Sequence, residues 1–201
     1  MRRRVPRLRP SKSDLLAASN RIVPDVIAHG LKVLFCGINP GLYTAWAGHH
    51  FARPGNRFWP ALFASGFTDR LLLPEEEREL LALGYGITNI VPRATLAADE
   101  LARDELLAGA KELRQKVHAY RPEYLAVLGL TAYRVGFACP KATLGVQAEP
   151  IGQTIVWVLP NPSGLNAHFT PKALAELFRE FRLGRDASPL NQQHRYFPPG
   201  K

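Results

Sequence analysis

The fold is decided by residues 32–42, which carry the sequence KVLFCGINPGL. Residues 32–38 form a nearly all-apolar run of strand length, a pattern typical of a parallel strand buried on both faces. The turn that follows places Asn39, Pro40 and Gly41 directly after this strand. In open α/β sheets ligands bind beyond the carboxyl ends of the strands, so this turn is a candidate binding loop.

Further strands and helices alternate along the chain outward from this stretch. Apolar runs predict strands at 86–91 (GITNIV), 124–129 (YLAVLG) and 155–159 (IVWVL). Amphipathic spacing, caps and proline starts predict the helices. They are expected from Ser13 or Asp14 to Gly30, from Asn56 to Gly66, from Pro74, from Asp99 to Tyr120, and from Thr170-Pro171 to Gly184. We therefore expect an α/β protein, a three-layer α/β/α sandwich with a mainly parallel central sheet of about four strands.

Composition narrows the class of protein. The 201 residues are 46% hydrophobic and 21% charged, which suits one globular domain and excludes a disordered or collagen-like chain. Two cysteines, Cys36 and Cys139, are too few for a disulfide framework or a four-cysteine metal site. No apolar run approaches the roughly 20 residues of a membrane helix, and no apolar signal region follows Met1. We expect a cytoplasmic protein that does not associate with membranes.

Charge suggests a partner. The chain has a formal net charge of +9, which favours a polyanion such as nucleic acid, although a solubility charge would give the same balance. Six of the basic residues precede position 13. We therefore divide the chain into a flexible basic arm at 1–12, a single domain at 13–184 and a loosely ordered tail at 185–201.

A second turn resembles the first. Residues 159–165 read LPNPSGL, so Asn-Pro again follows an apolar strand, with glycine soon after. Asparagine, proline and glycine are the commonest turn residues, and one such segment would indicate only a tight turn. Here two such segments follow strands whose ends are expected to border one site. This favours loops of a functional site over two simple turns.

Four motifs together resemble a known family. They are GINPGL at 37–42, FARPGNRFW at 51–59, GITNIV at 86–91 and NPSGL at 161–165. In content, order and spacing the sequence resembles the mismatch-specific uracil-DNA glycosylases, bacterial relatives of thymine-DNA glycosylase, over about residues 31–181. The resemblance implies a monofunctional DNA repair hydrolase that flips uracil out of duplex DNA, chiefly at G:U pairs, and hydrolyses its N-glycosidic bond. It further implies a monomer without a cofactor, whose partner is double-stranded DNA.

The resemblance also implies roles for residues of the first two motifs. Asn39 is expected to position the attacking water, because a side-chain amide can accept a hydrogen bond from water although it cannot take its proton. Phe51 is expected to stack on the flipped base, with Ile38, Gly41 and Thr44 around it. Read without the resemblance, Asn39 would be a turn residue and Phe51 a core residue.

The fourth motif is expected to enter DNA. Leu165 matches the wedge that fills the space left by the flipped nucleotide, and apolar wedges of this kind offset the cost of unstacking. Asn161, Ser163, Gly164 and His168 complete the expected DNA-contacting set. The family form continues with a small polar residue and then arginine, whereas this chain has Asn166 and Ala167. The opposite strand should therefore be held less firmly. His168 could substitute as a donor or could be a bystander, as single exposed histidines often are.

Asp99 allows two interpretations. Its carboxylate could assist the water or the sugar cation, or it could simply cap the helix predicted to begin there. The pair His49-His50 suggests a metal only weakly, because no third ligand is evident. Two other functions remain open, a non-catalytic mismatch-binding module and a nucleotide- or phosphate-handling α/β hydrolase.

Overall fold

Strand β1, Val33–Gly37, lies second in a five-stranded sheet of order β2-β1-β3-β5-β4. The structure is a computed structural model that describes residues 9–19 and 21–186. Strands β2 (Tyr85–Asn89), β3 (Tyr124–Leu128) and β5 (Ile155–Leu159) run parallel to β1, and the short β4 (Gly145–Val146) pairs antiparallel with β5. The expected α/β/α sandwich is confirmed. Most of the proposed basic arm and all but two residues of the proposed tail lie outside the described residues.

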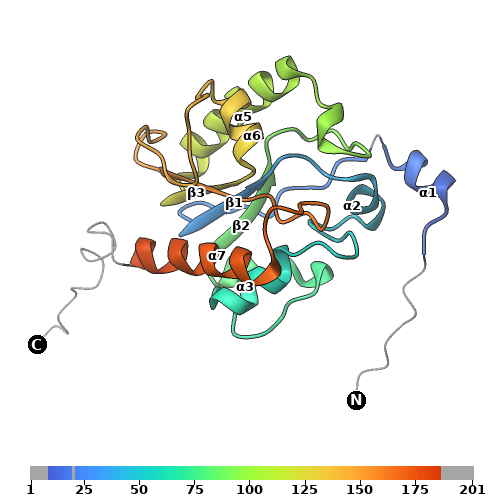
Figure 1. The fold of residues 1–201 in the computed structure, drawn as a ribbon, viewed down its shortest axis with the longest axis horizontal. Helices are drawn as coiled ribbons and strands as arrows, with labels where there is room; N and C mark the ends of the chain where they lie inside the picture. Colours follow the sequence, from blue (N-terminus) through green and yellow to red (C-terminus); the bar gives the residue numbers. More distant parts are fainter. Residues whose placement is uncertain (1–8, 20, 187–201) are drawn as a thin grey trace, which may run out of the picture.

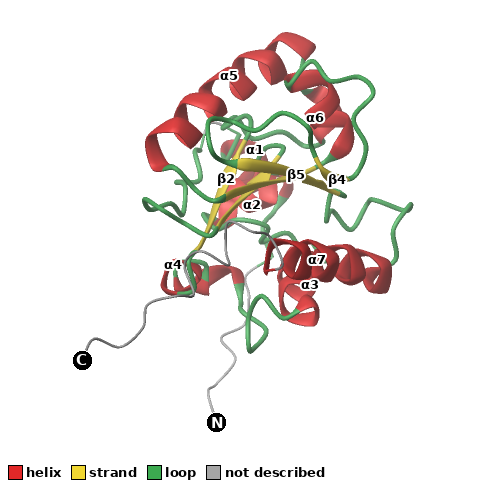
Figure 2. Cartoon of the chain, turned by 90° about the vertical axis from the view of Figure 1, so that its left-hand side faces the viewer, coloured by secondary structure: helices red, strands yellow, loops and turns green. Residues whose placement is uncertain are grey.

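Helices cover both faces of the sheet (Figures 1 and 2). On one face α3 packs against α7, and on the other α5 packs against α6. All five residues of β1 and of β3 are buried, as expected for parallel strands between two helical layers. The helices are α1 (Lys12–Ala17), α2 (Leu42–Ala47), α3 (Phe58–Ser65), α4 (Glu79–Ala82), α5 (Arg103–Tyr120), α6 (Leu130–Gly136) and α7 (Pro171–Asp186), with 3-10 turns at Pro74–Glu76 and Ala98–Glu100.

Two hydrophobic clusters fill the spaces between the layers. Aromatic rings dominate the cluster on the α3 and α7 side, where Phe35 of β1 lies edge-on to Phe58 with ring centroids 5.5 Å apart. Aliphatic side chains such as Leu113 and Val127 dominate the cluster beneath α5 and α6. The alternating side chains of β1 therefore feed both cores, and the strand is held rigidly up to its last residue. That rigidity carries over to the turn that follows it.

The N-terminal segment is not the long helix that the sequence predicted. Helix α1 ends at Ala17, and it is capped by Ser11, whose Oγ accepts a hydrogen bond from the Asp14 backbone N–H at 3.1 Å. Farther along, Val26 exchanges two backbone hydrogen bonds with Ile87 on the outer edge of β2. Pro24 lacks an N–H for a helix, and the open strand edge offers better partners, so the segment covers that edge.

Other helix boundaries also differ from the predictions. Pro74 begins a three-residue 3-10 turn and α4 begins only at Glu79, while α3 begins at Phe58 with Arg57, and not Asn56, as its cap. The helix expected from Asp99 is a 3-10 turn at Ala98–Glu100 followed by α5, which begins at Arg103 with Ala102 as its cap. Asp99 is therefore not the N-cap of α5. Helix α7 continues past Gly184 to Asp186, and Gly184 lies against the Trp157 ring, where a Cβ would come within 3.3 Å of Cη2. The fifth strand, β4, has two residues and is too short to show a period in sequence.

Candidate active site

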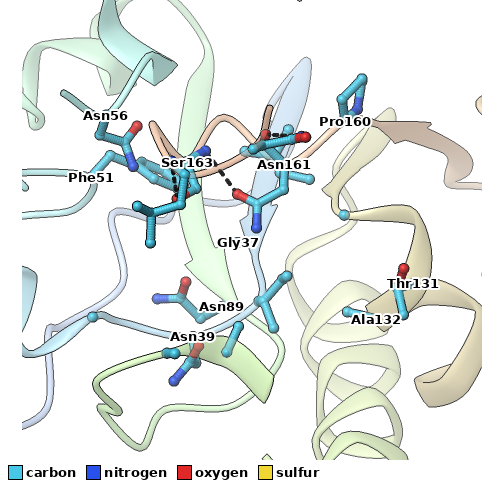
Figure 3. Close-up of a pocket in the computed structure, with 18 of the residues that line it drawn as sticks. Gly37, Asn39, Phe51, Asn56, Asn89, Thr131, Ala132, Pro160, Asn161 and Ser163 are labelled. Atoms are coloured by element: carbon cyan, nitrogen blue, oxygen red, sulfur yellow. Dashed lines mark hydrogen bonds between the residues drawn. The ribbon is translucent and has the colours of Figure 1, made fainter. Parts of the chain in front are cut away.

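The carboxyl ends of the four parallel strands border one cavity of ≈ 580 Å³ (Figure 3). In the sheet, β2 lies beside one edge of β1, and β3, the next strand in the sequence, lies beside the other edge. The strand order therefore reverses direction at β1. Ligand sites of open α/β sheets form at this kind of switch point.

The described part of the chain contains no helix long and apolar enough to cross a membrane.

Ten of the eleven expected site residues line this cavity. Gly164 is the exception. A Cβ at that position would overlap the Gly55 carbonyl oxygen, so the glycine allows two loops to approach closely. The ten residues are Ile38, Asn39, Gly41, Thr44, Phe51, Asp99, Asn161, Ser163, Leu165 and His168.

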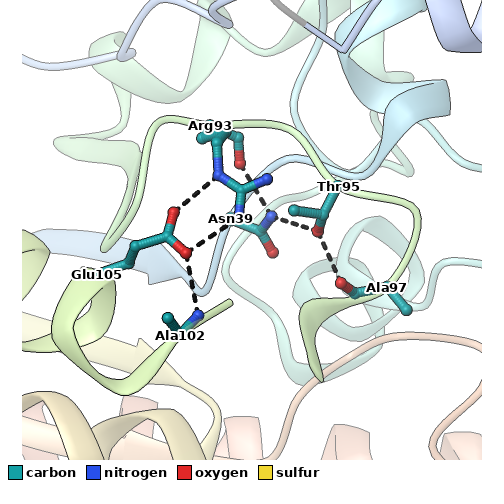
Figure 4. Close-up of polar contacts among 6 residues, drawn as sticks. All are labelled: Asn39, Arg93, Thr95, Ala97, Ala102 and Glu105. Atoms are coloured by element: carbon teal, nitrogen blue, oxygen red, sulfur yellow. Dashed lines mark hydrogen bonds and ion pairs between the residues drawn. The ribbon is translucent and has the colours of Figure 1, made fainter. Parts of the chain in front are cut away.

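The Asn39 amide is held by the loop that follows β2 (Figure 4). Its Nδ2 donates to the Arg93 carbonyl oxygen at 2.9 Å and to Thr95 Oγ1 at 2.7 Å. Thr95 Oγ1 in turn donates to the Ala97 carbonyl oxygen at 2.7 Å, so its lone pair faces Asn39. Because a carbonyl oxygen can only accept, the nitrogen must lie on this side and both of its hydrogens are engaged. Oδ1 is thus the atom left to bind a ligand.

The two loops that carry this contact are joined along their backbones. Leu42 N–H donates to the Thr95 carbonyl at 3.0 Å, and Thr95 N–H donates to the Pro40 carbonyl at 3.1 Å. Arg93 is fixed by Glu105 at the start of α5, with Nε to Oε1 at 2.7 Å and Nη2 to Oε2 at 3.0 Å. The exposed ion pair adds little energy by itself, but its two-point geometry limits movement of the loop.

Phe51 has an uncommon backbone conformation, with φ of 55° in the left-handed region. Such a conformation typically costs about 1–3 kcal/mol and persists only where the surroundings impose it. Here the ring stacks on Phe58, with centroids 4.1 Å apart and planes at 28°. Gly37 lies beside the edge of the Phe51 ring, where a Cβ would come within 3.3 Å of Phe51 Cζ. The backbone strain therefore accompanies an aromatic ring at the cavity wall.

Asn89 is a cavity residue that the sequence analysis missed. It is the last residue of β2, and a Cβ on Gly37 would overlap its Oδ1. Glycine at the end of β1 therefore keeps the space in front of Asn89 open. The signal in the sequence was a pair of polar residues, Thr88 and Asn89, within an otherwise apolar strand.

Buried His50 contacts Asn89 from behind. His50 Nε2 lies 3.0 Å from the Pro24 carbonyl oxygen, and His50 Nδ1 lies 3.4 Å from Asn89 Nδ2. The carbonyl can only accept, so Nε2 carries the proton and Nδ1 accepts from Asn89. Burial lowers the pKa of His50, against the opposing effect of Glu77, and so favours this neutral form. Asn89 Oδ1 is then the free oxygen of the amide.

Leu165 lies at the mouth of the cavity and is 69% exposed. Its loop is shaped by local contacts, since Asn161 Oδ1 accepts from Ser163 N–H at 3.0 Å and the Asn161 carbonyl accepts from Asn166 Nδ2 at 2.9 Å. Single exposed apolar side chains are common on protein surfaces, so it is the position of Leu165 at the cavity, and not its exposure alone, that makes it a candidate wedge. Leu165 is therefore accessible from outside the protein, and it is not a core residue.

Asp99 and His49 occupy different surroundings. Asp99 is exposed at the rim of the cavity, in the 3-10 turn at Ala98–Glu100. His49 Nδ1 lies 3.0 Å from Glu77 Oε1, and Glu77 Oε2 accepts the His50 N–H at 2.7 Å. The two histidines therefore share a carboxylate partner. Among the described residues, no group of three or more His, Cys, Asp or Glu side chains is placed to hold a metal ion.

The family model of the uracil DNA glycosylase superfamily matches residues 24–182. The chain belongs to the uracil DNA glycosylase superfamily. Membership implies a DNA glycosylase, a hydrolase whose substrate is DNA. The resemblance found in the sequence is thus confirmed at the level of the superfamily. The match begins after α1 and ends within α7, and so it covers all five strands and the cavity of this glycosylase.

Proposed function

We propose that this glycosylase removes uracil from mismatched duplex DNA, chiefly at G:U pairs, with a water positioned by Asn39. The observation that carries the proposal is the fixed Asn39 amide. With both Nδ2 hydrogens given to Arg93 and Thr95, Oδ1 is available to accept a hydrogen bond from water at the cavity wall. Such fixed positioning supplies catalysis without a strong base.

The proposed reaction has the following steps. A flipped uracil stacks on Phe51, and Leu165 fills the space that it leaves in the duplex. The C1′–N1 bond breaks first, and its electron pair leaves with the uracil anion. Water held by Asn39 then adds to C1′ of the sugar cation and loses a proton, which Asp99 or solvent accepts. Backbone N–H groups of the 38–41 turn stabilise the charge on the departing base.

Asn89 gives the cavity its preference for uracil. Oδ1 of its amide accepts the N3–H of uracil, and the second Nδ2 hydrogen donates to O4. Cytosine presents the opposite pattern, an acceptor at N3 and a donor at the 4-position, and is therefore rejected. The neutral His50 behind Asn89 supports this assignment because it takes one Nδ2 hydrogen and leaves Oδ1 free.

The proposal is tested with a labelled duplex that contains one G:U pair, incubated with the protein and then with alkali. Strand cleavage at the uracil position is expected. A mismatch-binding module would retard the duplex in a gel without cleavage. A nucleotide hydrolase would instead release phosphate or free base from nucleotides and leave the duplex intact. Either of these results would contradict the glycosylase proposal.

Opposite-base preference is measured in the same assay with A:U pairs and single strands. Ala167 is exposed in the loop that carries Leu165 and provides no charge there. We therefore propose that G:U is preferred over A:U only modestly, with excision from single strands approaching both. A preference of several orders of magnitude for G:U would show that other contacts, His168 first among them, hold the opposite strand.

Asp99→Asn is expected to slow excision by about 10- to 100-fold, near the lower end of what a positioned acid–base group contributes. The melting temperature should hardly change, because Asp99 is exposed and does not cap α5. Asp104→Asn is the matched control, since it removes the same charge from an exposed position in the first turn of α5. Equal rates for both variants would exclude a catalytic role for Asp99.

Uracil excision is expected to fall in acid, at a pH below the ordinary histidine pKa of about 6.5. Burial lowers the pKa of His50, so its neutral form persists to more acidic pH before Nδ1 gains a proton. The protonated ring must donate to Asn89, which turns the amide and presents NH₂ to the N3–H of uracil. Glu77, Asp25 and His49 are the charged or titratable groups facing this ring.

The measurement is a single-turnover pH profile for the wild type and for His50→Asn. Asparagine places an oxygen near the Nδ1 position and does not titrate, so the acidic limb should flatten while the neutral-pH rate stays within about tenfold. Asp99→Asn is run alongside to separate the contribution of Asp99 to the rate from that of His50. An acidic limb unchanged by His50→Asn would disprove the role of His50.

A further inference from the structure

Arg57 gathers the carbonyl groups of the wedge loop, which we define as residues 161–169. Its guanidinium donates through Nη1 to Phe169 O and through Nη2 to Ser163 O and Asn166 O, the last at 2.8 Å. Its own backbone N–H donates to Pro162 O at 2.9 Å. One residue thus contacts four carbonyl groups spread over the length of the loop.

The guanidinium is itself anchored to the rigid part of the molecule. Arg57 directly precedes α3, where Phe58 is fully buried in the core and α3 packs against α7. Its Nε is buried and has no hydrogen-bond partner among the described residues. Leaving a buried donor unpaired is costly, so the position of this side chain is set by the loop contacts and not by its own hydrogen-bonding optimum.

The wedge loop also rests on the segment just before Arg57. Gly164 lies so close to the Gly55 carbonyl that a Cβ would overlap it. Only arginine presents several N–H donors in a flat, rigid fork, whereas lysine presents one flexible ammonium. The shape of the loop that carries Leu165 therefore depends on the Arg57 side chain in addition to the contacts that Asn161 makes within the loop.

We propose that Arg57 is a positioning residue that holds the wedge loop in the conformation that enters duplex DNA. It acts through Leu165 and does not touch the base or the sugar. Single-stranded DNA needs no wedge, because its base is already unpaired. Loss of Arg57 should therefore impair excision from duplexes and spare excision from single strands. The inference rests on the proposed glycosylase function.

The first experiment compares Arg57→Lys and Arg57→Met in single-turnover excision on G:U duplex and on single-stranded uracil DNA. The duplex rate is expected to fall by about 10- to 100-fold, the range for a catalytic element displaced by about 1 Å. The single-strand rate should stay within about twofold. Arg179→Met is the matched control, because Arg179 also donates to a carbonyl, that of Ala64 at 2.8 Å, away from the wedge loop.

The second experiment needs no DNA. Chymotrypsin cleavage after Leu165 or Phe169 should be faster in both Arg57 variants than in the wild type and unchanged in Arg179→Met.

Leu165→Ala is a control for the excision experiment. It should show the duplex-selective loss of excision while the loop stays intact. If Leu165→Ala lacks that loss, the proposed wedge function fails, whereas the proteolysis result still reports on the loop.

Three results would overturn the inference itself. One is equal loss of Arg57→Lys activity on duplex and single strands, which would indicate a general structural role. Another is unchanged proteolysis of the loop in both variants. The last is an unchanged duplex rate in the Arg57 variants while Leu165→Ala shows its expected effect.

Discussion

Asn39→Ala should lower the single-turnover rate of uracil release by about 1,000-fold or more, within the range for a fixed group that positions and activates a reactant. Duplex binding should survive, because the wedge loop and Phe51 are unaffected. The measurement is product formation at saturating enzyme, with affinity from a separate titration. Wild-type release by the variant would remove the central residue of the proposed mechanism.

Thr95 gives this prediction a graded control. Thr95→Val keeps the shape of the side chain but removes the acceptor that holds Asn39 Nδ2 at 2.7 Å. The amide keeps its second anchor at the Arg93 carbonyl, so a smaller loss of about tenfold is expected, which corresponds to about 1.4 kcal/mol in the barrier. Thr95→Ser retains the hydroxyl and should restore most of the rate. The loss of rate is thus expected to be largest for Asn39→Ala, smaller for Thr95→Val and smallest for Thr95→Ser. This order would show that the orientation of the Asn39 amide, and not only its presence, contributes to the rate.

Asn89→Asp should reduce uracil excision by about 100- to 1,000-fold, the typical cost of losing one donor to charge that develops in the transition state. The replacement has nearly the same shape, but it removes the Nδ2 donor to O4 and sets a negative charge beside the departing uracil anion. Rates on uracil and competition by free uracil are both measured. Normal rates would exclude Asn89 from base recognition.

Asn56→Asp is the matched control for that variant. Asn56 also lines the cavity, and its Oδ1 accepts the Phe58 backbone N–H at 2.9 Å before α3. The carboxylate of aspartate can accept the same hydrogen bond, so the same change in charge should have a much smaller effect. A comparable loss in both variants would point to a general effect of charge in the cavity.

Strand prediction succeeded because parallel strands covered on both faces carry continuous apolar runs, as in β1, β3 and β5. The segment at 21–29 misled the same approach, because apolar residues at helical spacing also occur in a strand-like segment that covers the edge of β2. Pro24 was the one local feature that argued against a helix there, because proline lacks the backbone N–H. The extended conformation of this segment is fixed by the two hydrogen bonds between Val26 and Ile87, which lie more than 60 residues apart in the chain.

The site residues also divide into those that the sequence identified and those that it did not. Asn39, Phe51 and Leu165 could be singled out in sequence because their turns are built of residues with special backbone requirements, and such turns leave a local signature. Asn89 and His50 left only a weak one. Each looks like an ordinary strand or loop residue until the ends of β1 and β2 lie side by side and bring a glycine, an amide and an imidazole together.

Local chemistry along the chain was therefore enough to establish the sandwich, its parallel strands and the loops that border the cavity, because side-chain periodicity and turn residues act over a few positions. The direction of the Asn39 amide depends on Arg93 and Thr95, which are 54 and 56 residues away. The shape of the wedge loop depends on Arg57, which is 106 to 112 residues away. Contacts over such separations leave no period in a sequence, and they exist only once the core has brought the strand ends together.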